Sequence, residues 1–128
     1  MVPNDRRYTN THEWIMLDGG TATIGLTDYA QHELGDIVYV ELPQVGERIA
    51  AGGRLAVVES VKAASDVFVA VGGEVSEANA ALEDAPERIN EEPWTAWIAR
   101  LKVENVDESA LLDAVAYEAI VAAEEAKA

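Results

Sequence analysis

Short apolar runs separated by glycines or polar turns recur along most of the chain and predict β-strands. Residues 12–17 and 21–26 flank a polar turn and predict a hairpin, whose second half alternates apolar side chains with threonines. Residues 37–42 are rich in β-branched side chains, and residues 97–103 alternate apolar with basic positions. The pattern therefore predicts a mainly β fold.

Two further apolar runs, residues 54–58 and 67–71, flank the polar segment 59–66 and predict a second hairpin. Lys62 falls near its tip and is the only lysine before Arg100. The residues beside it are small or medium-sized. A long amine with little bulk around it is accessible to the active site of another protein, although a solvated lysine on an ordinary hairpin has the same local pattern.

Residues 45–49 and 71–75 share a hydrophobic–glycine–acid pattern on either side of Lys62. Two similar β units around one lysine indicate a quasi-symmetric sandwich that presents the lysine at one end. The glycine pair 72–73, like two earlier glycine pairs, is interpreted as a turn.

Short helices are expected between the strands. Asp28 starts a capping-box-like pattern that predicts a helix over residues 28–34, and Gly35 can end this helix in a left-handed cap. Asn79 is expected to cap another short helix over residues 79–83.

A longer helix is expected near the C-terminus, over about residues 107–122, with fraying beyond it to residue 128. Its apolar positions recur at helical spacing and predict one stripe that docks on the sandwich. The stripe consists of Leu112, Val115, Ala116, Ala119 and Ile120.

Residues 59–66, Glu-Ser-Val-Lys-Ala-Ala-Ser-Asp, resemble the lipoylation site of the glycine cleavage system H protein family. Biotin carriers share the general architecture, but their lysine is usually flanked by methionines, so Val61 and Ala63 favour a lipoyl site. The resemblance continues in order along nearly the whole chain, which argues against chance agreement. The further matching segments are residues 8–14, 24–31, 34–43, 73–75, 79–83 and 111–117.

One segment, residues 92–97, departs from the family pattern. It lacks the usual glycine-containing turn and carries an additional tryptophan, Trp94. Ala70 also stands where a proline is common. Both changes leave the local loop geometry open but touch neither Lys62 nor its immediate flanks.

The resemblance implies a lipoyl/biotinyl-type barrel-sandwich hybrid, mainly β with small flanking helices, in which the modified lysine lies at a hairpin tip and a helix ends the chain. It implies one domain over residues 1–128, with a lipoyl-type core over about residues 37–103. By the same resemblance, lipoic acid is joined to Lys62 as a lipoamide, and Glu59 and Ser60 flank the attachment site.

The resemblance further implies a carrier that has no catalytic activity of its own. The arm on Lys62 shuttles the aminomethyl group of glycine from a pyridoxal-phosphate-dependent glycine decarboxylase, the P protein, to a folate-dependent aminomethyltransferase, the T protein. Dihydrolipoyl dehydrogenase, the L protein, then reoxidises the arm. A lipoate ligase or an octanoyltransferase is expected to begin its attachment.

Residues aligned with Thr11, Glu13 and Asp66 are implied as a cleft in which the loaded arm rests. The arm then carries an amine that is cationic near neutral pH, and Glu13 and Asp66 have the charge to hold it. Each of the two, taken singly, is equally consistent with an ordinary surface carboxylate.

Composition argues against several other classes of protein. A net charge of −15 disfavours binding to a phosphate backbone and favours solubility, with long-range attraction to basic rims on partner enzymes as a second effect. The chain has no cysteine for a disulfide, a thiolate metal site or thiol catalysis. His12 and His32 lack the spaced partners that a metal site requires, so packing or surface roles are expected for both. No motif supports independent catalysis.

The sequence has no run of about eighteen apolar residues, so no membrane span is expected. The N-terminus lacks the apolar segment of a secretion signal. A monomer in a bacterial cytoplasm is expected, whereas a processed protein of the mitochondrial matrix would show the same pattern. Two other functions stay open. A lipoate-relay protein would donate its lipoyl group to 2-oxoacid dehydrogenase subunits, and a non-carrier interaction domain would keep the fold without modification.

Overall fold

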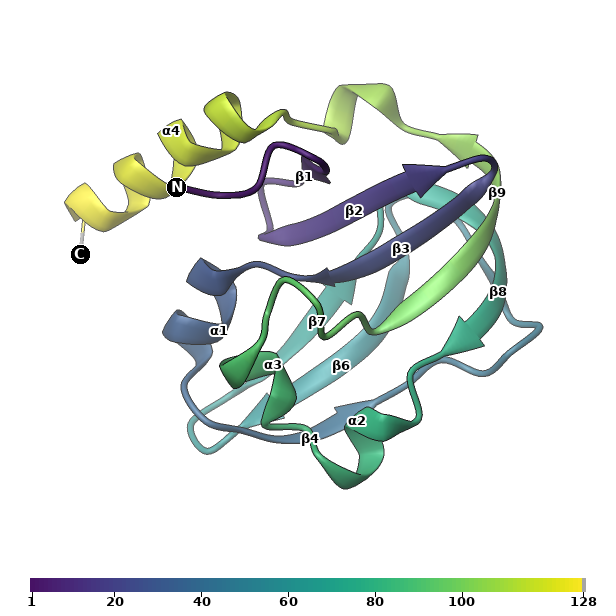
Figure 1. Cartoon of the computed structure of the whole chain (residues 1–128), viewed down its shortest axis with the longest axis horizontal. Coiled ribbons are helices and arrows are strands. Elements are labelled where there is room, and N and C mark those ends of the chain that lie inside the picture. The colour runs from purple at the N-terminus through teal and green to yellow at the C-terminus, as the bar shows by residue number, and fades with distance from the viewer. Residues whose placement is uncertain (128) are drawn as a thin grey trace.

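The computed structural model describes residues 1–127, and its strands form two sheets packed as a flattened, open barrel-sandwich (Figure 1). Residue 128, the end of the expected domain, lies outside the described residues. The larger sheet has the order β1-β2-β3-β9-β8-β5 and the smaller one the order β4-β6-β7. The larger sheet comprises β1 Arg7–Tyr8, β2 Glu13–Asp18, β3 Thr21–Leu26, β5 Arg48–Ile49, β8 Val71–Ala78 and β9 Ala99–Val106. The smaller sheet comprises β4 Ile37–Glu41, β6 Arg54–Ser60 and β7 Ala64–Phe68.

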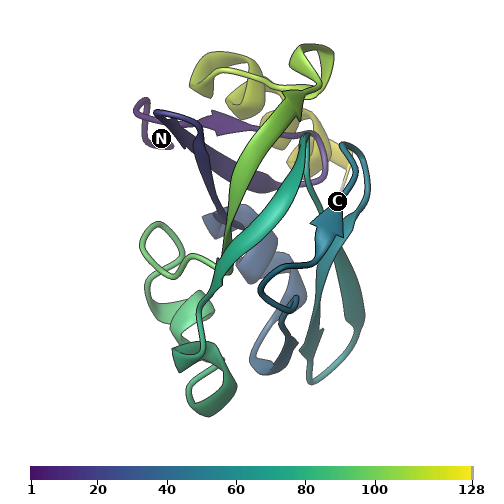
Figure 2. The ribbon, with the colours of Figure 1, turned by 90° about the vertical axis from the view of Figure 1, so that its right-hand side faces the viewer.

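All paired strands are antiparallel, and β8 and β9 cross the molecule side by side (Figure 2). Alternation along the strands sends apolar side chains into the space between the sheets. Ile24 on β3, Val58 on β6 and Leu101 on β9 are almost wholly buried there. The mainly β barrel-sandwich fold expected from the sequence is therefore confirmed.

The hairpin that carries Lys62 is confirmed, but its return strand begins earlier than expected. β7 spans Ala64–Phe68 rather than residues 67–71, because Glu59 pairs with Ala64 and the ladder continues up to the tip. Only residues 61–63 remain outside the two strands. The apolar run after Phe68 therefore belongs partly to β8.

The interpretation of glycines 72–73 as a turn was wrong, since both residues lie within β8. A Cβ on Gly72 would lie 2.2 Å from Asn105 Oδ1, and one on Gly73 would lie 2.0 Å from the Lys102 carbonyl oxygen. Glycine is needed here for the close approach of β9 at a β-bulge. The earlier pairs do occupy turns, with positive φ at Gly19, Gly20 and Gly52.

Helix α1, Asp28–Leu34, has the predicted bounds, but Thr27 rather than Asp28 is its cap. The Thr27 hydroxyl accepts from the Ala30 N–H at 3.2 Å, whereas Asp28 accepts from the side chain of Gln31. Gly35 ends the helix with a φ of 80°, and its N–H donates to the Gln31 carbonyl. Its ψ of −160° lies outside the left-handed helical region that was expected.

Two one-turn helices follow β8. Helix α2 is Ala81–Asp84, and the Asn79 side chain does not cap it but donates to the Trp97 carbonyl at 2.8 Å. Helix α3, Arg88–Glu91, was not predicted, and it buries Ile89 against the core.

The C-terminal helix α4 is Ala114–Lys127, so it begins seven residues later than the expected start at 107 and continues past 122. A 3₁₀ turn, Glu108–Ala110, precedes it. The predicted apolar stripe was wrong, because Val115 is 76% exposed and Tyr117 is the buried residue of the helix. The ring centroids of Tyr117 and Tyr8 lie 4.7 Å apart in a stacked arrangement. This stacking determines which face of the helix is buried. Within the described residues, no helix is both long and apolar enough to cross a membrane.

Candidate functional site

Lys62 lies exposed at the tip of the β6–β7 hairpin, where the backbone is closely held. The Ser60 hydroxyl accepts from the N–H groups of Lys62 and Ala63 at 3.3 and 3.1 Å, and the Ser60 N–H donates to the Ala63 carbonyl at 2.7 Å. The Val61 N–H donates to the Asp36 carbonyl at 3.0 Å. The lysine therefore projects from a turn that is fixed to the rest of the fold.

The two predicted flanking residues have different surroundings. Ser60 closes the turn, as just described. Glu59 is exposed on the outer face of the smaller sheet, in register with Tyr39 on β4 and Ala64 on β7. Its carboxylate is thus presented to any protein that approaches the lysine.

Glu13, at the start of β2, is 2% exposed and its carboxylate is held from three sides. Its Oε1 accepts from the hydroxyls of Thr9 and Thr11, each at 2.5 Å. Its Oε2 accepts from the Phe68 N–H at 3.2 Å. Burial raises the pKa of Glu13, and the hydrogen bonds from Thr11, Thr9 and Phe68 partly oppose that rise.

Thr11, Glu13 and Asp66 line one cavity of about 220 Å³, although Asp66 is distant in sequence from the other two. We call this cavity the acidic cleft. Asp66, on β7, is exposed and lies 3.7 Å from Arg54. The other lining residues are His12, Leu26, Tyr29, Ala30, Glu33, Leu34, Ser65 and Glu124.

Lys62 lies next to the wall of the acidic cleft. Its Cε is 3.6 Å from the position that a Cβ on Gly35 would take. Gly35 directly follows Glu33 and Leu34, which line the cleft, and Asp66 belongs to the same hairpin as the lysine. A group attached to the lysine amine would start beside the cleft, and carboxylates with threonine hydroxyls fit a cationic end group.

Sequence reasoning missed several residues of this site. Thr9 was not singled out, and His12 was assigned only to packing or the surface. Glu124 reaches the cleft from α4, the other end of the chain. The alternate spacing of Thr9, Thr11 and Glu13 was not a signal of this site, because residues 10–12 form a turn in which the His12 N–H donates to the Thr9 carbonyl.

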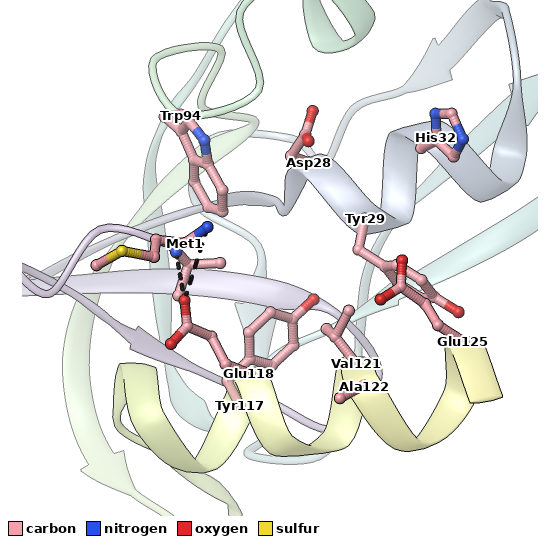
Figure 3. Close-up of a pocket in the computed structure, with 11 residues that line it drawn as sticks. Met1, Asp28, Tyr29, His32, Trp94, Tyr117, Glu118, Val121, Ala122 and Glu125 are labelled. Atoms are coloured by element: carbon pink, nitrogen blue, oxygen red, sulfur yellow. Dashed lines mark hydrogen bonds and ion pairs between the residues drawn. The ribbon is translucent and has the colours of Figure 1, made fainter.

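A second, larger cavity of about 510 Å³ lies between α1, α4 and the loop that contains Trp94 (Figure 3). Tyr29 lines both this cavity and the acidic cleft. Glu118 lines this cavity next to the N-terminus of the chain, and its carboxylate accepts from the Val2 N–H at 2.8 Å. Trp94, which departs from the family pattern, thus lines the larger cavity and not the acidic cleft. Among the described residues, no cluster of His, Cys, Asp and Glu has the arrangement of a metal site.

Comparisons with known proteins agree with this geometry. The family model described as "Glycine cleavage H-protein" matches residues 6–124. The "Glycine cleavage system H protein" of Chromohalobacter salexigens is 50% identical over 127 residues, which cover 97% of each chain. The "Probable glycine cleavage system H protein" of Thermococcus gammatolerans is 56% identical over 113 residues, covering 86% of this chain and 84% of that one.

The fold agrees as well. The crystal structure of a glycine cleavage system H protein from Mycobacterium marinum superposes with a TM-score of 0.88 at 38% identity, covering 94% of this chain and 99% of that one. Family match, full-length identity and shared fold lead to one conclusion: the chain belongs to the glycine cleavage H-protein family, whose members are lipoyl carrier subunits of the glycine cleavage system.

Proposed function

We propose that Lys62 carries a lipoyl group through an amide bond and that the chain acts as the mobile-arm carrier of glycine cleavage. The observation that carries this proposal is the position of the lysine. It lies exposed on a fixed turn, beside a cleft lined by Thr11, Glu13 and Asp66, in a chain of the H-protein family. When bound, the lipoyl group supplies a dithiolane that accepts the aminomethyl group of glycine as CO₂ leaves and that is later reoxidised from its dithiol form.

The hairpin has a positioning role in this function. Amide formation removes the positive charge of Lys62, so the arm itself does not compete for the carboxylates of the cleft. The hydrogen bonds at Ser60 keep the attachment point in place while the arm moves. All flexibility then lies in the arm, and tethering gives each partner active site a high local concentration of the carried group.

The acidic cleft would hold and shield the loaded end of the arm. A cationic amine fits between the buried carboxylate of Glu13 and the exposed carboxylate of Asp66, with the Thr11 hydroxyl beside them. Charge attraction is stronger in a cavity from which most water is excluded than in open solvent. Exclusion of water would also slow hydrolysis of the carried group.

The proposed partners are those of the glycine cleavage system. They are the P protein, glycine decarboxylase; the T protein, an aminomethyltransferase; and the L protein, dihydrolipoyl dehydrogenase. A lipoate ligase or an octanoyltransferase would begin the modification of Lys62. The net charge of −15 supports electrostatic attraction to basic rims on these enzymes. We place the carrier in the cytoplasm as a monomer, with bacterial relatives as support.

Intact mass after expression in lipoate-fed cells tests the proposal. The parent protein is expected to gain the mass of one lipoyl group, and the Lys62→Arg variant is expected to gain none. The same cells should express a known lipoyl domain as a positive control. If that control is modified and the parent chain is not, the carrier function is wrong.

A further inference from the structure

Helix α4 is anchored to the rest of the fold by Tyr117, with Ala114 and Val121 packed beside the same aromatic cluster. Within Ala114–Lys127, Tyr117 is the buried residue, and its ring stacks on Tyr8. Four of the residues that follow it border the larger cavity (Figure 3), and of these Val121 also packs against the aromatic cluster. The four are Glu118, Val121, Ala122 and Glu125. A segment with few buried contacts can detach without unfolding the whole protein.

The hydroxyl of Tyr117 joins α4 to two other elements. It lies 2.6 Å from Thr27 Oγ1, the cap of α1, and 2.8 Å from His12 Nδ1. The second ring nitrogen of His12 lies 3.1 Å from Glu124 Oε1, about two helical turns beyond Tyr117 along α4. His12 is therefore held between two residues of the same helix.

His12 has a backbone conformation that needs such support. Its φ of 75° makes it the non-glycine residue with positive φ in the described chain, and a Cβ disfavours this region. Backbone contacts also fix it, because its N–H donates to the Thr9 carbonyl and its carbonyl accepts from the Thr27 N–H. Residues held in such conformations are concentrated at functional sites.

His12 directly precedes Glu13 in the loop that builds the acidic cleft. This loop also supplies Thr9 and Thr11, whose hydroxyls both donate to the Glu13 carboxylate. Glu124 lines the cleft as well, so α4 forms part of the cleft wall and also contacts the loop that contains His12. Glu13 thus directly follows a residue whose side chain is held by a helix that is distant in sequence.

We propose that Tyr117 and His12 are positioning residues of the acidic cleft, through which the docking of α4 holds the Glu13 loop in the arrangement that receives the arm. Detachment of α4 then releases His12 from its positive φ, loosens Glu13 and opens the cleft on the Glu124 side. This inference rests on the proposed function of the cleft, and it adds α4 as the element that holds the walls of the cleft in place.

The first test uses the unlipoylated protein, so it does not depend on carrier activity. Amide hydrogen exchange is compared between the parent, Tyr117→Phe and Tyr39→Phe, which removes a hydroxyl from a half-exposed tyrosine far from α4. Tyr117→Phe keeps the ring but loses both hydrogen bonds. Exchange at the amides of Glu13 and Phe68 is expected to rise about five- to tenfold, the usual effect of losing about one hydrogen bond. Exchange in β6 and β9 should not change.

The second test follows the lipoylated and loaded proteins after removal of the partner enzymes. Tyr117→Phe is expected to lose its carried group several-fold faster than the parent and Tyr39→Phe, while the extent of lipoylation by intact mass stays the same. If Tyr117→Phe does not fold, His12→Asn replaces it, because asparagine tolerates a positive φ but lacks the imidazole contacts with α4.

Unchanged exchange at Glu13 and Phe68 in a folded variant would overturn the positioning inference. Faster exchange supports it. A Glu13→Gln, Asp66→Asn variant separates the two proposals: if this variant loses the group at the parental rate, the function of the cleft is wrong, whereas the coupling of α4 to the Glu13 loop is judged by exchange alone.

Discussion

Lys62 and Gly35 lie against each other: the lysine Cε is 3.6 Å from the place where a Cβ on Gly35 would stand. This contact joins the hairpin tip to the end of α1, although 27 positions separate the two residues in the sequence. Because α1 continues into the wall of the acidic cleft, Lys62 and the cleft share one side of the molecule.

Gly35→Ala should destabilise the fold without blocking modification. The φ of 80° with a ψ of −160° lies in a region that is essentially restricted to glycine, so alanine costs about 1–3 kcal/mol, whereas the added methyl meets only the flexible lysine side chain at ordinary contact distance. Urea unfolding should report this loss, and intact mass should show lipoylation at the parental extent. Failure of lipoylation in a folded variant would mean that Gly35 itself is recognised by the attaching enzyme.

Gly73→Ala is expected to be far more damaging. A Cβ at this position would lie 2.0 Å from the Lys102 backbone oxygen, so β8 and β9 must separate, at a cost of about 3 kcal/mol. Gly19→Ala is the matched control, since its Cβ has no neighbour within 4 Å and only its φ of 58° is unfavourable. The midpoint of thermal unfolding should be well below that of Gly19→Ala in the Gly73→Ala variant. Equal midpoints would contradict the close approach of β9 to β8.

The pH dependence of stability should reveal the burial of Glu13. Its pKa in the folded protein is raised above the ordinary value of 4.5, so the folded state holds a proton that the unfolded state has lost. Stability from this group is therefore complete below that value and is lost as pH rises through the folded pKa. Glu13→Gln has no proton to lose.

Urea unfolding across this range should show the difference in unfolding free energy, parent minus Glu13→Gln, falling as pH increases and then levelling. A difference that rises with pH would mean that the hydrogen bonds from Thr9, Thr11 and Phe68 outweigh burial and lower the pKa.

Removal of both cleft carboxylates should shorten the lifetime of the carried group. The Glu13→Ala, Asp66→Ala double variant is expected to accept lipoate normally, yet to lose the group several-fold faster after loading, because neither carboxylate remains to hold the amine. Glu83→Ala, Asp84→Ala changes the net charge equally at exposed positions of α2 and is the control. Equal lifetimes of the carried group in the two double variants would show that the cleft does not protect that group.

Salt should weaken the encounter with partner enzymes. Surface charge acts over about 10 Å at 0.1 M salt, and over shorter distances as salt increases. With a net charge of −15, the apparent KM for this carrier in glycine decarboxylation is expected to rise with ionic strength, while kcat stays nearly constant. A flat KM would assign the acidic residues to solubility alone.

Local signals predicted α1 well, since Gly35 and the polar start of the helix lie within a few residues of its ends. Elements whose limits depend on distant partners were less well predicted. The start of β7 is set by the pairing of Glu59 with Ala64, and the buried face of α4 is set by the stack of Tyr117 on Tyr8. Neither contact has a signature in the nearby sequence.

The site divides in the same way. The motif around Lys62 is continuous, so its position at a hairpin tip followed from the sequence. The surroundings of Glu13 combine Thr9 with Phe68 and, through His12, with residues of α4. Such an arrangement exists only after the two ends of the chain have come together, which explains why His12 was assigned to packing or the surface.

The Ser60 hydroxyl, which binds two N–H groups of the tip, has a consequence for the geometry of transfer. A group attached to Lys62 would move about a fixed point, so its reacting end would stay within one arm length of the hairpin tip. Under the proposed function, every partner enzyme would have to place its active-site entrance within reach of that arm, at a depth set by the arm and not by bending of the carrier. The turn would thereby set the same reach from the carrier surface for every enzyme that uses the arm.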